Sequence, residues 1–167
     1  MTITIRPADA AADAAAVAAI YAHHVLHGSG TFEEEPPAAD EMARRMTHVL
    51  GRGWPWLVAE DADGMLGFAY AAQFRERSAY RYSCEDSIYL HPGAIGRGLG
   101  RQLLEALIAA SRAAGFRRMY AVIGDAANAG SIGVHAALGF DHAGVLGGIG
   151  YKFGRDLDVV FMQRTIE

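Results

Sequence analysis

Three closely spaced glycines constrain this sequence more than any other feature. Gly96, Gly98 and Gly100 follow a strand-like run, Ser87 to Leu90, and a short turn, and they open an apolar stretch with helical periodicity. Successive glycines let backbone N–H groups converge on an anion, and the first turn of a helix adds unpaired donors and the positive end of its dipole. The pattern therefore predicts a strand, a phosphate-binding turn and a helix.

The spacing of these glycines argues against two common nucleotide sites. A dinucleotide fold has Gly-x-Gly-x-x-Gly and an acidic residue roughly 20 positions later. Here the third glycine comes one residue early, and no Asp or Glu lies between Ala106 and Gly124. A P-loop needs Gly-Lys-Ser or Gly-Lys-Thr, which is absent from this turn. Two interpretations stay open, an anion site of another kind or a tight turn whose glycines only supply positive φ.

Composition narrows the class of protein. The chain has 167 residues, of which 51% are hydrophobic and 20% charged, so we expect one folded domain over residues 1–167. The net charge of −4 without a basic block argues against nucleic acid as a partner. The single cysteine, Cys84, suits a reducing cytosol, and we see neither a signal peptide nor a membrane-spanning run. We expect a soluble cytoplasmic protein with no membrane partner.

Hydrophobic periodicity predicts an α/β fold with helices packed on a mixed sheet. We expect helices over residues 9–26, 38–50, from the glycine turn to about 115, and 130–138. We expect strands over residues 3–5, 56–59, 65–70, 80–90, 119–123, near 151, and 157–165. Because a helix connects residues 80–90 to residues 119–123, these two strands should be parallel with a right-handed crossover.

The glycine turn also carries a family resemblance. Residues 95–100, Ile-Gly-Arg-Gly-Leu-Gly, resemble the acetyl-CoA pyrophosphate loop of the GNAT N-acetyltransferases, whose pattern is Gln/Arg-x-x-Gly-x-Gly/Ala. Ile95 departs from the usual Gln or Arg, which implies a weaker side-chain contact at a site bound mainly by backbone donors. Further motifs are similar to the phosphinothricin and methionine sulfoximine acetyltransferases of that superfamily: Thr31-Phe32, Trp56-Leu57-Val58-Ala59, Ser87-Ile88-Tyr89-Leu90, Leu138-Gly139-Phe140 and Gly150-Tyr151-Lys152.

The resemblance implies both a fold and an activity. The fold would be a mixed, mostly antiparallel sheet of about six to seven strands flanked by about four helices, with a central splayed pair of parallel strands. The activity would be transfer of acetyl from acetyl-CoA, as a cosubstrate and without a metal, to the α-amino group of a small amino-acid-like substrate. Relatives are commonly homodimers, so we expect a homodimer. The alternatives are a general small-amine or N-terminal acetyltransferase and a non-catalytic acyl-CoA-binding module.

Two residues of the matched motifs are candidates for catalysis. Glu85 matches the family's carboxylate base, which would take a proton from the acceptor's ammonium group, and by strand alternation it shares a face with Ser87 and Tyr89. His135 stands where many relatives have a tyrosine that protonates the departing thiolate, and it could act as acid, base or positioning group. The presence of Glu85 together with His135 disfavours a non-catalytic module.

The resemblance also supplies the expected binding residues. Backbone groups of the strand before the turn would pair with the pantetheine amides, and an N–H of Tyr89 or Leu90 would polarise the thioester oxygen. The expected acetyl-CoA contacts are Ile88, Tyr89, Leu90, Ile95, Gly96, Arg97, Gly98, Leu99, Gly100 and Asn128. The expected acceptor contacts are Phe32, Arg75, Arg77 and Tyr80, where an arginine would clamp a carboxylate or phosphinate. Lys152 would serve either the substrate or a neighbouring subunit.

Overall fold

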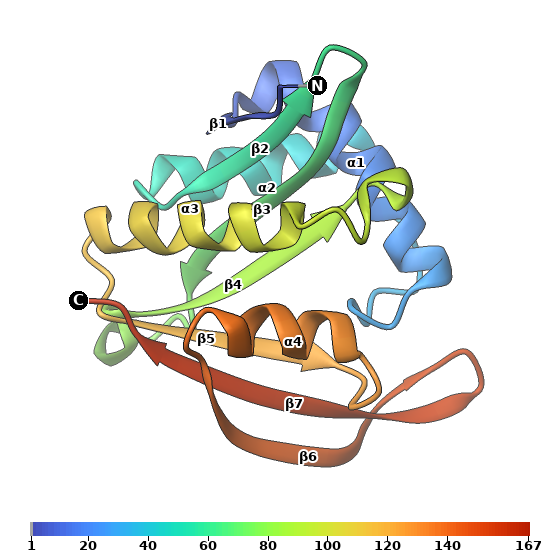
Figure 1. The fold of residues 1–167 in the computed structure, drawn as a ribbon, viewed down its shortest axis with the longest axis vertical. Coiled ribbons are helices and arrows are strands. Elements are labelled where there is room, and N and C mark those ends of the chain that lie inside the picture. Colours follow the sequence, from blue (N-terminus) through green and yellow to red (C-terminus); the bar gives the residue numbers. More distant parts are fainter. Residues whose placement is uncertain (1) are drawn as a thin grey trace.

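A computed structural model describes residues 2–167 and contains seven strands and four α-helices. The strands are β1 (Thr4–Pro7), β2 (Trp56–Asp61), β3 (Gly64–Gln73), β4 (Ser83–Leu90), β5 (Arg118–Gly124), β6 (Asp141–Lys152) and β7 (Arg155–Thr165). The helices are α1 (Ala10–His27), α2 (Ala39–Gly51), α3 (Leu99–Ala113) and α4 (Ala129–Ala137), with short 3₁₀ turns at η1 (Ser78–Tyr80) and η2 (Pro92–Ala94). Figure 1 shows these elements in chain order.

The strands form one sheet in the order β1-β2-β3-β4-β5-β7-β6. The pair β4–β5 is parallel, as the helical connection between them predicts, and every other neighbouring pair is antiparallel. The parallel ladder is short, because it runs only from the pair Ser83 and Arg118 to the pair Asp86 and Ala121. Beyond these residues β4 and β5 separate, as Figure 1 shows at the right of the two strands.

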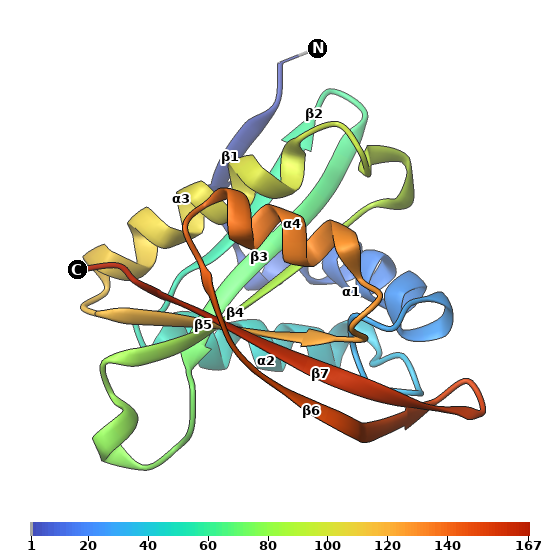
Figure 2. The same cartoon turned by 60° about the horizontal axis from the view of Figure 1, so that its bottom comes forward.

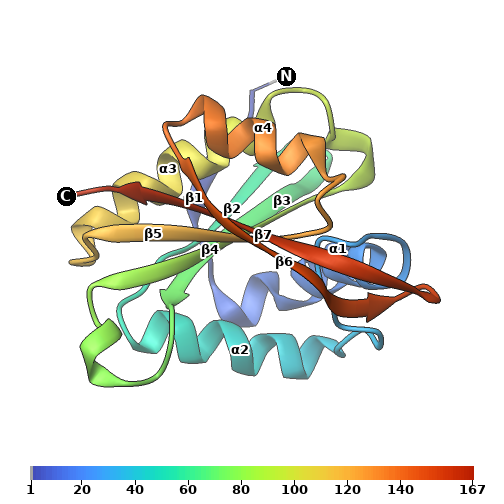
Figure 3. The same cartoon turned by 90° about the horizontal axis from the view of Figure 1, so that it is seen from below.

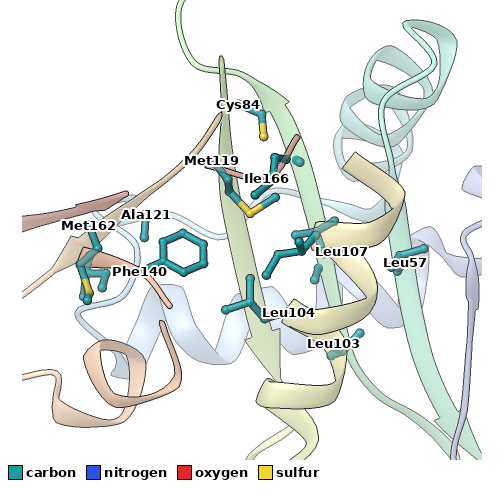
Figure 4. Packing of buried hydrophobic residues seen from close by; sticks show 14 of the residues in the cluster. Leu57, Cys84, Leu103, Leu104, Leu107, Met119, Ala121, Phe140, Met162 and Ile166 are labelled. Carbon is teal, nitrogen blue, oxygen red and sulfur yellow. The ribbon is translucent and has the colours of Figure 1, made fainter. Parts of the chain in front are cut away.

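Two layers of helices cover the two faces of the sheet. Helices α3 and α4 lie on one face and α1 and α2 on the other, which is plain in Figures 2 and 3. The core under α3 gathers Leu103, Leu104 and Leu107 against Met119 and Cys84 (Figure 4). The opposite core brings side chains of α1 and α2 against Trp56 and Phe68. Each strand of the centre is therefore buried on both sides.

Local chemistry explains where some of these elements begin. Asp9 accepts hydrogen bonds from the N–H groups of Ala11 and Ala12, which satisfies donors that α1 would otherwise leave unpaired. Gly98 precedes α3 with a φ of 78°, a conformation that glycine adopts without steric cost. No helix among residues 2–167 combines the length and the apolar character needed to cross a bilayer.

Two strands, β4 and β6, begin well away from the residues predicted from sequence. The strand expected from residue 80 begins at Ser83, because Tyr80 and Arg81 instead donate their N–H groups back to Arg77 and Ser78 in a 3₁₀ turn. The strand expected near residue 151 is β6, which already begins at Asp141. Its four glycines and two register shifts against β7 conceal the alternation of side chains that identifies a strand.

Candidate active site

The separation of β4 from β5 exposes one set of backbone groups on β4. Ser83 accepts a hydrogen bond from Phe74 on the β3 side, and His91 donates one to Leu66 on that same side. The backbone N–H and C=O groups of successive residues point alternately to the two sides of a strand. Those of Tyr89 therefore also point towards β3, whereas those of Ile88 and Leu90 point to the side of β5. Those two residues lie past the end of the parallel ladder. Of the two thioester donors predicted from sequence, only Leu90 directs its N–H into the splay.

His24 of α1 lies against the end of the same strand. Its Nε2 is 2.7 Å from the carbonyl oxygen of Leu90, and its ring packs against Tyr89. Burial is the main cause that lowers the pKa of His24, so the neutral ring donates Nε2–H to this carbonyl. No group of three His, Cys, Asp or Glu suited to hold a metal ion is found within residues 2–167.

The glycine turn lies between the splay and α3. Gly96 and Gly98 have φ values of 80° and 78°. The helical hydrogen bonds of α3 begin with the N–H of Gln102, which donates to the carbonyl oxygen of Gly98. The N–H groups of Leu99, Gly100 and Arg101 are therefore available to an anion. Leu99 buries its side chain in the core, which leaves it only a backbone contribution. The other residues of the predicted loop, Ile95 and Arg97, are exposed.

Glu85 lies on the α1/α2 face of β4, at the level of the last pairs with β5. It is partly buried, and burial raises the pKa of its carboxyl to about 7, although the nearby Arg75 acts in the opposite direction. Arg75 Nη1 lies 3.9 Å from Glu85 Oε2. A carboxyl with a pKa near neutrality can accept a proton at physiological pH and release it again, as a general base requires.

His135 lies on the opposite face of the sheet from Glu85. Its Nε2 is 2.9 Å from Asp86 Oδ1 and its Nδ1 is 2.7 Å from the carbonyl oxygen of Ser131. Burial alone would lower the pKa of His135, but the hydrogen bond and charge of Asp86 outweigh it and the pKa is raised. Both ring nitrogens therefore face acceptors inside the protein. The structure does not bring the two predicted catalytic side chains together, because Glu85 and Asp86 alternate across β4.

The predicted acceptor residues come from two loops. Arg75 stacks on Phe74 and approaches Glu85, whereas Arg77 makes no ion pair within the described part of the chain. Gln73 donates to the carbonyl oxygens of both arginines and so shapes the loop that holds them. Tyr80 lies in the turn η1 and is partly exposed, with its ring 6.1 Å from that of Phe74.

Phe32 belongs to the loop between α1 and α2, and its ring covers two glycines of the sheet. A Cβ added at Gly124 would lie 2.8 Å from Phe32 Cε1, and one added at Gly150 would lie 2.7 Å from Phe32 Cζ. Asn128, expected to contact pantetheine, caps α4 by accepting the N–H of Ser131 at 3.2 Å. Its side-chain oxygen is thus engaged within the protein.

Sequence reasoning missed two residues that surround this region, Asp86 and His24, and it left Lys152 between the substrate and a neighbouring subunit. Asp86, which pairs with His135, is next to Glu85 in the matched motif, and its charge on the core side of a strand was the available signal. His24, which contacts Leu90, carried no local signal because the contact joins residues far apart in sequence. Lys152, the only lysine of the chain, donates to the carbonyl oxygens of Gly28 and Thr31 of its own chain.

Comparison with known proteins identifies the family to which this fold belongs. Residues 6–161 match the family described as the acetyltransferase (GNAT) domain. The chain belongs to this family and is an acyltransferase with the GNAT fold, which confirms the fold and the family predicted from sequence.

Three members of the family are similar to this chain over most of its length. Phosphinothricin N-acetyltransferase of Alcaligenes faecalis is 51% identical over 154 residues, which cover 92% of this chain and 78% of that protein. L-methionine sulfoximine/L-methionine sulfone acetyltransferase of Salmonella typhimurium is 38% identical, with 99% of this chain and 95% of that protein covered. The crystal structure of a phosphinothricin acetyltransferase from Sinorhizobium meliloti in complex with acetyl-CoA superposes with a TM-score of 0.94 at 48% identity, covering 99% of this chain and 89% of that chain.

Proposed function

We propose that this chain transfers acetyl from acetyl-CoA to the α-amino group of a small amino-acid analogue of the phosphinothricin or methionine sulfoximine type. The observation that carries this proposal is Glu85, whose carboxyl has a pKa of about 7 beside the point where β4 leaves β5. The activities named for the relatives from Alcaligenes and Salmonella support the class of acceptor.

The proposed chemistry is direct attack of the amine on the thioester. Acetyl-CoA supplies the acetyl group as a thioester, and the CoA thiol is the leaving group. Glu85 takes the proton from the acceptor's ammonium group, directly or through one water, so that a neutral amine is available. The N–H of Leu90, which points into the splay, stabilises the negative charge that develops on the thioester oxygen. The donors at the start of α3 hold the pyrophosphate.

Arg75 gives the acceptor its orientation in this proposal. Its guanidinium lies 3.9 Å from Glu85, so an acceptor carboxylate bound to Arg75 would hold its own α-amino group close to the base. Arg77 and Tyr80 would complete the same wall from the β3–β4 loop, and Phe32 would face them from the α1–α2 loop.

An acyl-enzyme intermediate is not part of this proposal. Cys84 is the only cysteine of the chain and is fully buried in the core under α3 (Figure 4). Burial raises the pKa of its thiol to about 12, so the thiolate needed for nucleophilic attack is scarce at neutral pH.

His135 acts as a positioning group in this proposal and not as the acid or base. Its two ring nitrogens are engaged by Asp86 and Ser131, and its side chain is buried on the face opposite Glu85. The pair Asp86–His135 would fix α4 against β4 and thereby the shape of the splay. Proton transfer to the departing thiol would then come from solvent or from the acceptor's own proton.

We further propose that the protein is a cytoplasmic homodimer. One thiol and no disulfide partner suit a reducing compartment. The hairpin β6–β7 exposes apolar side chains at Val145, Leu146, Ile149, Tyr151 and Phe153, and exposed apolar patches of this kind favour contact with a second copy.

A panel of acceptors tests the proposed function. Release of CoA thiol would be measured with acetyl-CoA and phosphinothricin, methionine sulfoximine, methionine sulfone, the protein amino acids and simple amines. We expect turnover with the carboxylate-bearing analogues and little with amines that lack a carboxylate. Equal rates on both groups would favour a general small-amine acetyltransferase, and CoA binding with no turnover at all would favour a binding module.

A further inference from the structure

Lys152 is the only lysine among 167 residues, and it is buried. Its side chain crosses from β6 to the loop between α1 and α2, where Nζ donates to the carbonyl oxygens of Gly28 at 2.7 Å and Thr31 at 2.8 Å. Within residues 2–167 it forms no ion pair with a carboxylate. Burying a charge costs free energy unless the group is hydrogen-bonded. The two carbonyl oxygens supply these hydrogen bonds, so we ask what the contact holds in place.

The chemistry of this contact explains why a lysine is used. The chain contains fourteen arginines and one lysine. A guanidinium presents its donors in a wide planar fork, whereas an ammonium is a compact group whose three donors can converge on neighbouring carbonyls. Gly28 and Thr31 are three residues apart and offer two such carbonyls to one nitrogen. The lysine thus holds both ends of a short loop segment.

The held segment leads directly to Phe32. Thr31 is fixed a second time, because its Oγ1 lies 2.8 Å from the hydroxyl of Tyr21 on α1. Ser29 donates to Asp125 at the end of β5. The ring of Phe32 then lies over Gly124 and Gly150, where any larger residue would collide with it. The loop is therefore held by Lys152 of β6, by Asp125 directly after β5 and by Tyr21 of α1, and Phe32 packs on both strands.

This fastening occurs on the same face of the sheet as Glu85. The register pairs Gly124 with Val159, Gly150 with Leu157 and Lys152 with Arg155, so all three residues point to one face. The alternation along β5 places Tyr120 on that face with Gly124, and Tyr120 is the register partner of Glu85. Figure 3 shows the loop after α1 lying beside the end of the β6–β7 hairpin. Phe32 and Glu85 thus lie on the same face of the sheet.

We propose that Lys152 is a positioning residue for the acceptor, which fixes the α1–α2 loop so that Phe32 forms one wall of the acceptor pocket opposite Arg75. This inference rests on the proposed function, because it assigns the wall to an amino-acid acceptor. The proposed acetyl-CoA contacts, the glycine turn and the backbone of Leu90, lie in the segment from β4 to the start of α3, whereas Lys152 lies on β6. Its loss therefore affects the acceptor and not the donor.

Kinetics of Lys152→Met test this assignment. Methionine keeps most of the length of the side chain but cannot donate to the two carbonyls. We expect the KM of the acceptor to rise about tenfold, while the KM of acetyl-CoA changes less than about twofold. The control is Arg44→Met, which removes one exposed cation from α2 and so changes the net charge equally. Arg44→Met should keep both Michaelis constants.

A second variant tests the position of Phe32 without removing Lys152, in case Lys152→Met fails to fold. Gly150→Ala keeps Lys152 but places a methyl group against the ring of Phe32, and it should give the same rise in the acceptor KM. Reaction of the native protein with an amine-reactive acetylating reagent, followed by peptide mass spectrometry, adds a readout independent of turnover. Lys152 should react far more slowly than in urea, and saturating acceptor should slow it further.

The possible outcomes separate this inference from the proposed function. Turnover by the wild-type enzyme together with unchanged acceptor KM in Lys152→Met and Gly150→Ala would overturn the inference alone. Equal increases in the Michaelis constants of donor and acceptor would also overturn it, because they indicate general loss of structure. A wild-type enzyme without turnover on any amino acid of the panel would overturn the proposed function and this inference with it.

Discussion

Glu85 and Asp86 are neighbours in sequence, yet alternation along β4 gives them different environments. Glu85 faces α1 and α2 beside Arg75, where burial raises the pKa of its carboxyl to about 7. Asp86 faces α4 and holds the ring of His135. Glu85 thus lies where we propose that the acceptor binds, whereas Asp86 holds helix α4 against the strand. The functional difference between them comes from the face of the strand and not from residue type.

Replacing Glu85 tests its role as general base. We expect Glu85→Gln to lower kcat by about 100-fold, because the amide cannot take the acceptor's proton. Affinity for acetyl-CoA should change little, since the carboxylate is not among the donors at the glycine turn. Steady-state kinetics and isothermal titration with acetyl-CoA measure the two effects, and an unchanged kcat would remove Glu85 from the mechanism.

The pH profile distinguishes the two arginines of the acceptor loop. A base works when deprotonated, so kcat/KM should rise with pH through the pKa of Glu85, about 7. Arg75 lowers that pKa, so Arg75→Ala should move the rise to higher pH as well as increase the acceptor KM. Arg77→Ala is the matched control, and we expect it to keep the wild-type midpoint. Identical midpoints in both variants would contradict the contact between Arg75 and Glu85.

At the scale of elements, the turn between β4 and α3 meets two structural requirements. It must reverse direction through residues with positive φ, and it must leave the first N–H groups of α3 open. Gly96 and Gly98 meet the first requirement. Gly100 has a different role, since it already lies within α3, and a Cβ added there would meet Leu90 and Val134 only at ordinary contact distance. The three glycines are therefore not equivalent, although the sequence presents them as one pattern.

Alanine substitutions separate the glycines of this turn. Gly98→Ala should destabilise the fold by about 1 kcal/mol and weaken acetyl-CoA binding, because a Cβ is strained at a φ of 78°. Gly100→Ala should leave the free energy of unfolding unchanged or raise it by up to about 1 kcal/mol, because alanine favours a helix more than glycine does. Urea denaturation of both variants measures the difference. A larger loss for Gly100→Ala would contradict the assigned conformations.

At the scale of the whole molecule, the β6–β7 hairpin lies at the edge of the sheet (Figure 2). It exposes apolar side chains there. The same hairpin carries Gly150 and Lys152, which hold the loop of Phe32. The proposed surface for a second copy and the proposed wall of the acceptor pocket are therefore built on one element. A change at the subunit contact would be transmitted to Phe32 through a few residues.

Oligomeric state gives a direct measurement of this surface. We expect sedimentation equilibrium to give about twice the 17.9 kDa mass of one chain. Ile149→Asp should shift the equilibrium towards the monomer, because it places a charge in the middle of the exposed apolar set. A wild-type protein that sediments as a monomer at micromolar concentration would contradict the proposed dimer.

The sequence by itself determined the family, the order of the main elements and the glycine turn. These features follow from the periodicity of side chains and the spacing of glycines. Both are local properties that involve only residues close together in the chain. Most of strand β6 could not be predicted in this way, because its glycines interrupt the alternation of side chains that marks a strand.

Only the tertiary structure decided which predicted residues lie together. It separated His135 from Glu85 across the sheet and placed Arg75 beside Glu85. It directed the N–H of Leu90, and not that of Tyr89, into the splay, and it brought Lys152 to the loop of Phe32. Each of these relations depends on strand register or on contacts between residues far apart in the chain. The physical reason is that alternation along β4 tells which side chains share a face, but the helices and loops that meet each face come from segments far away in the chain.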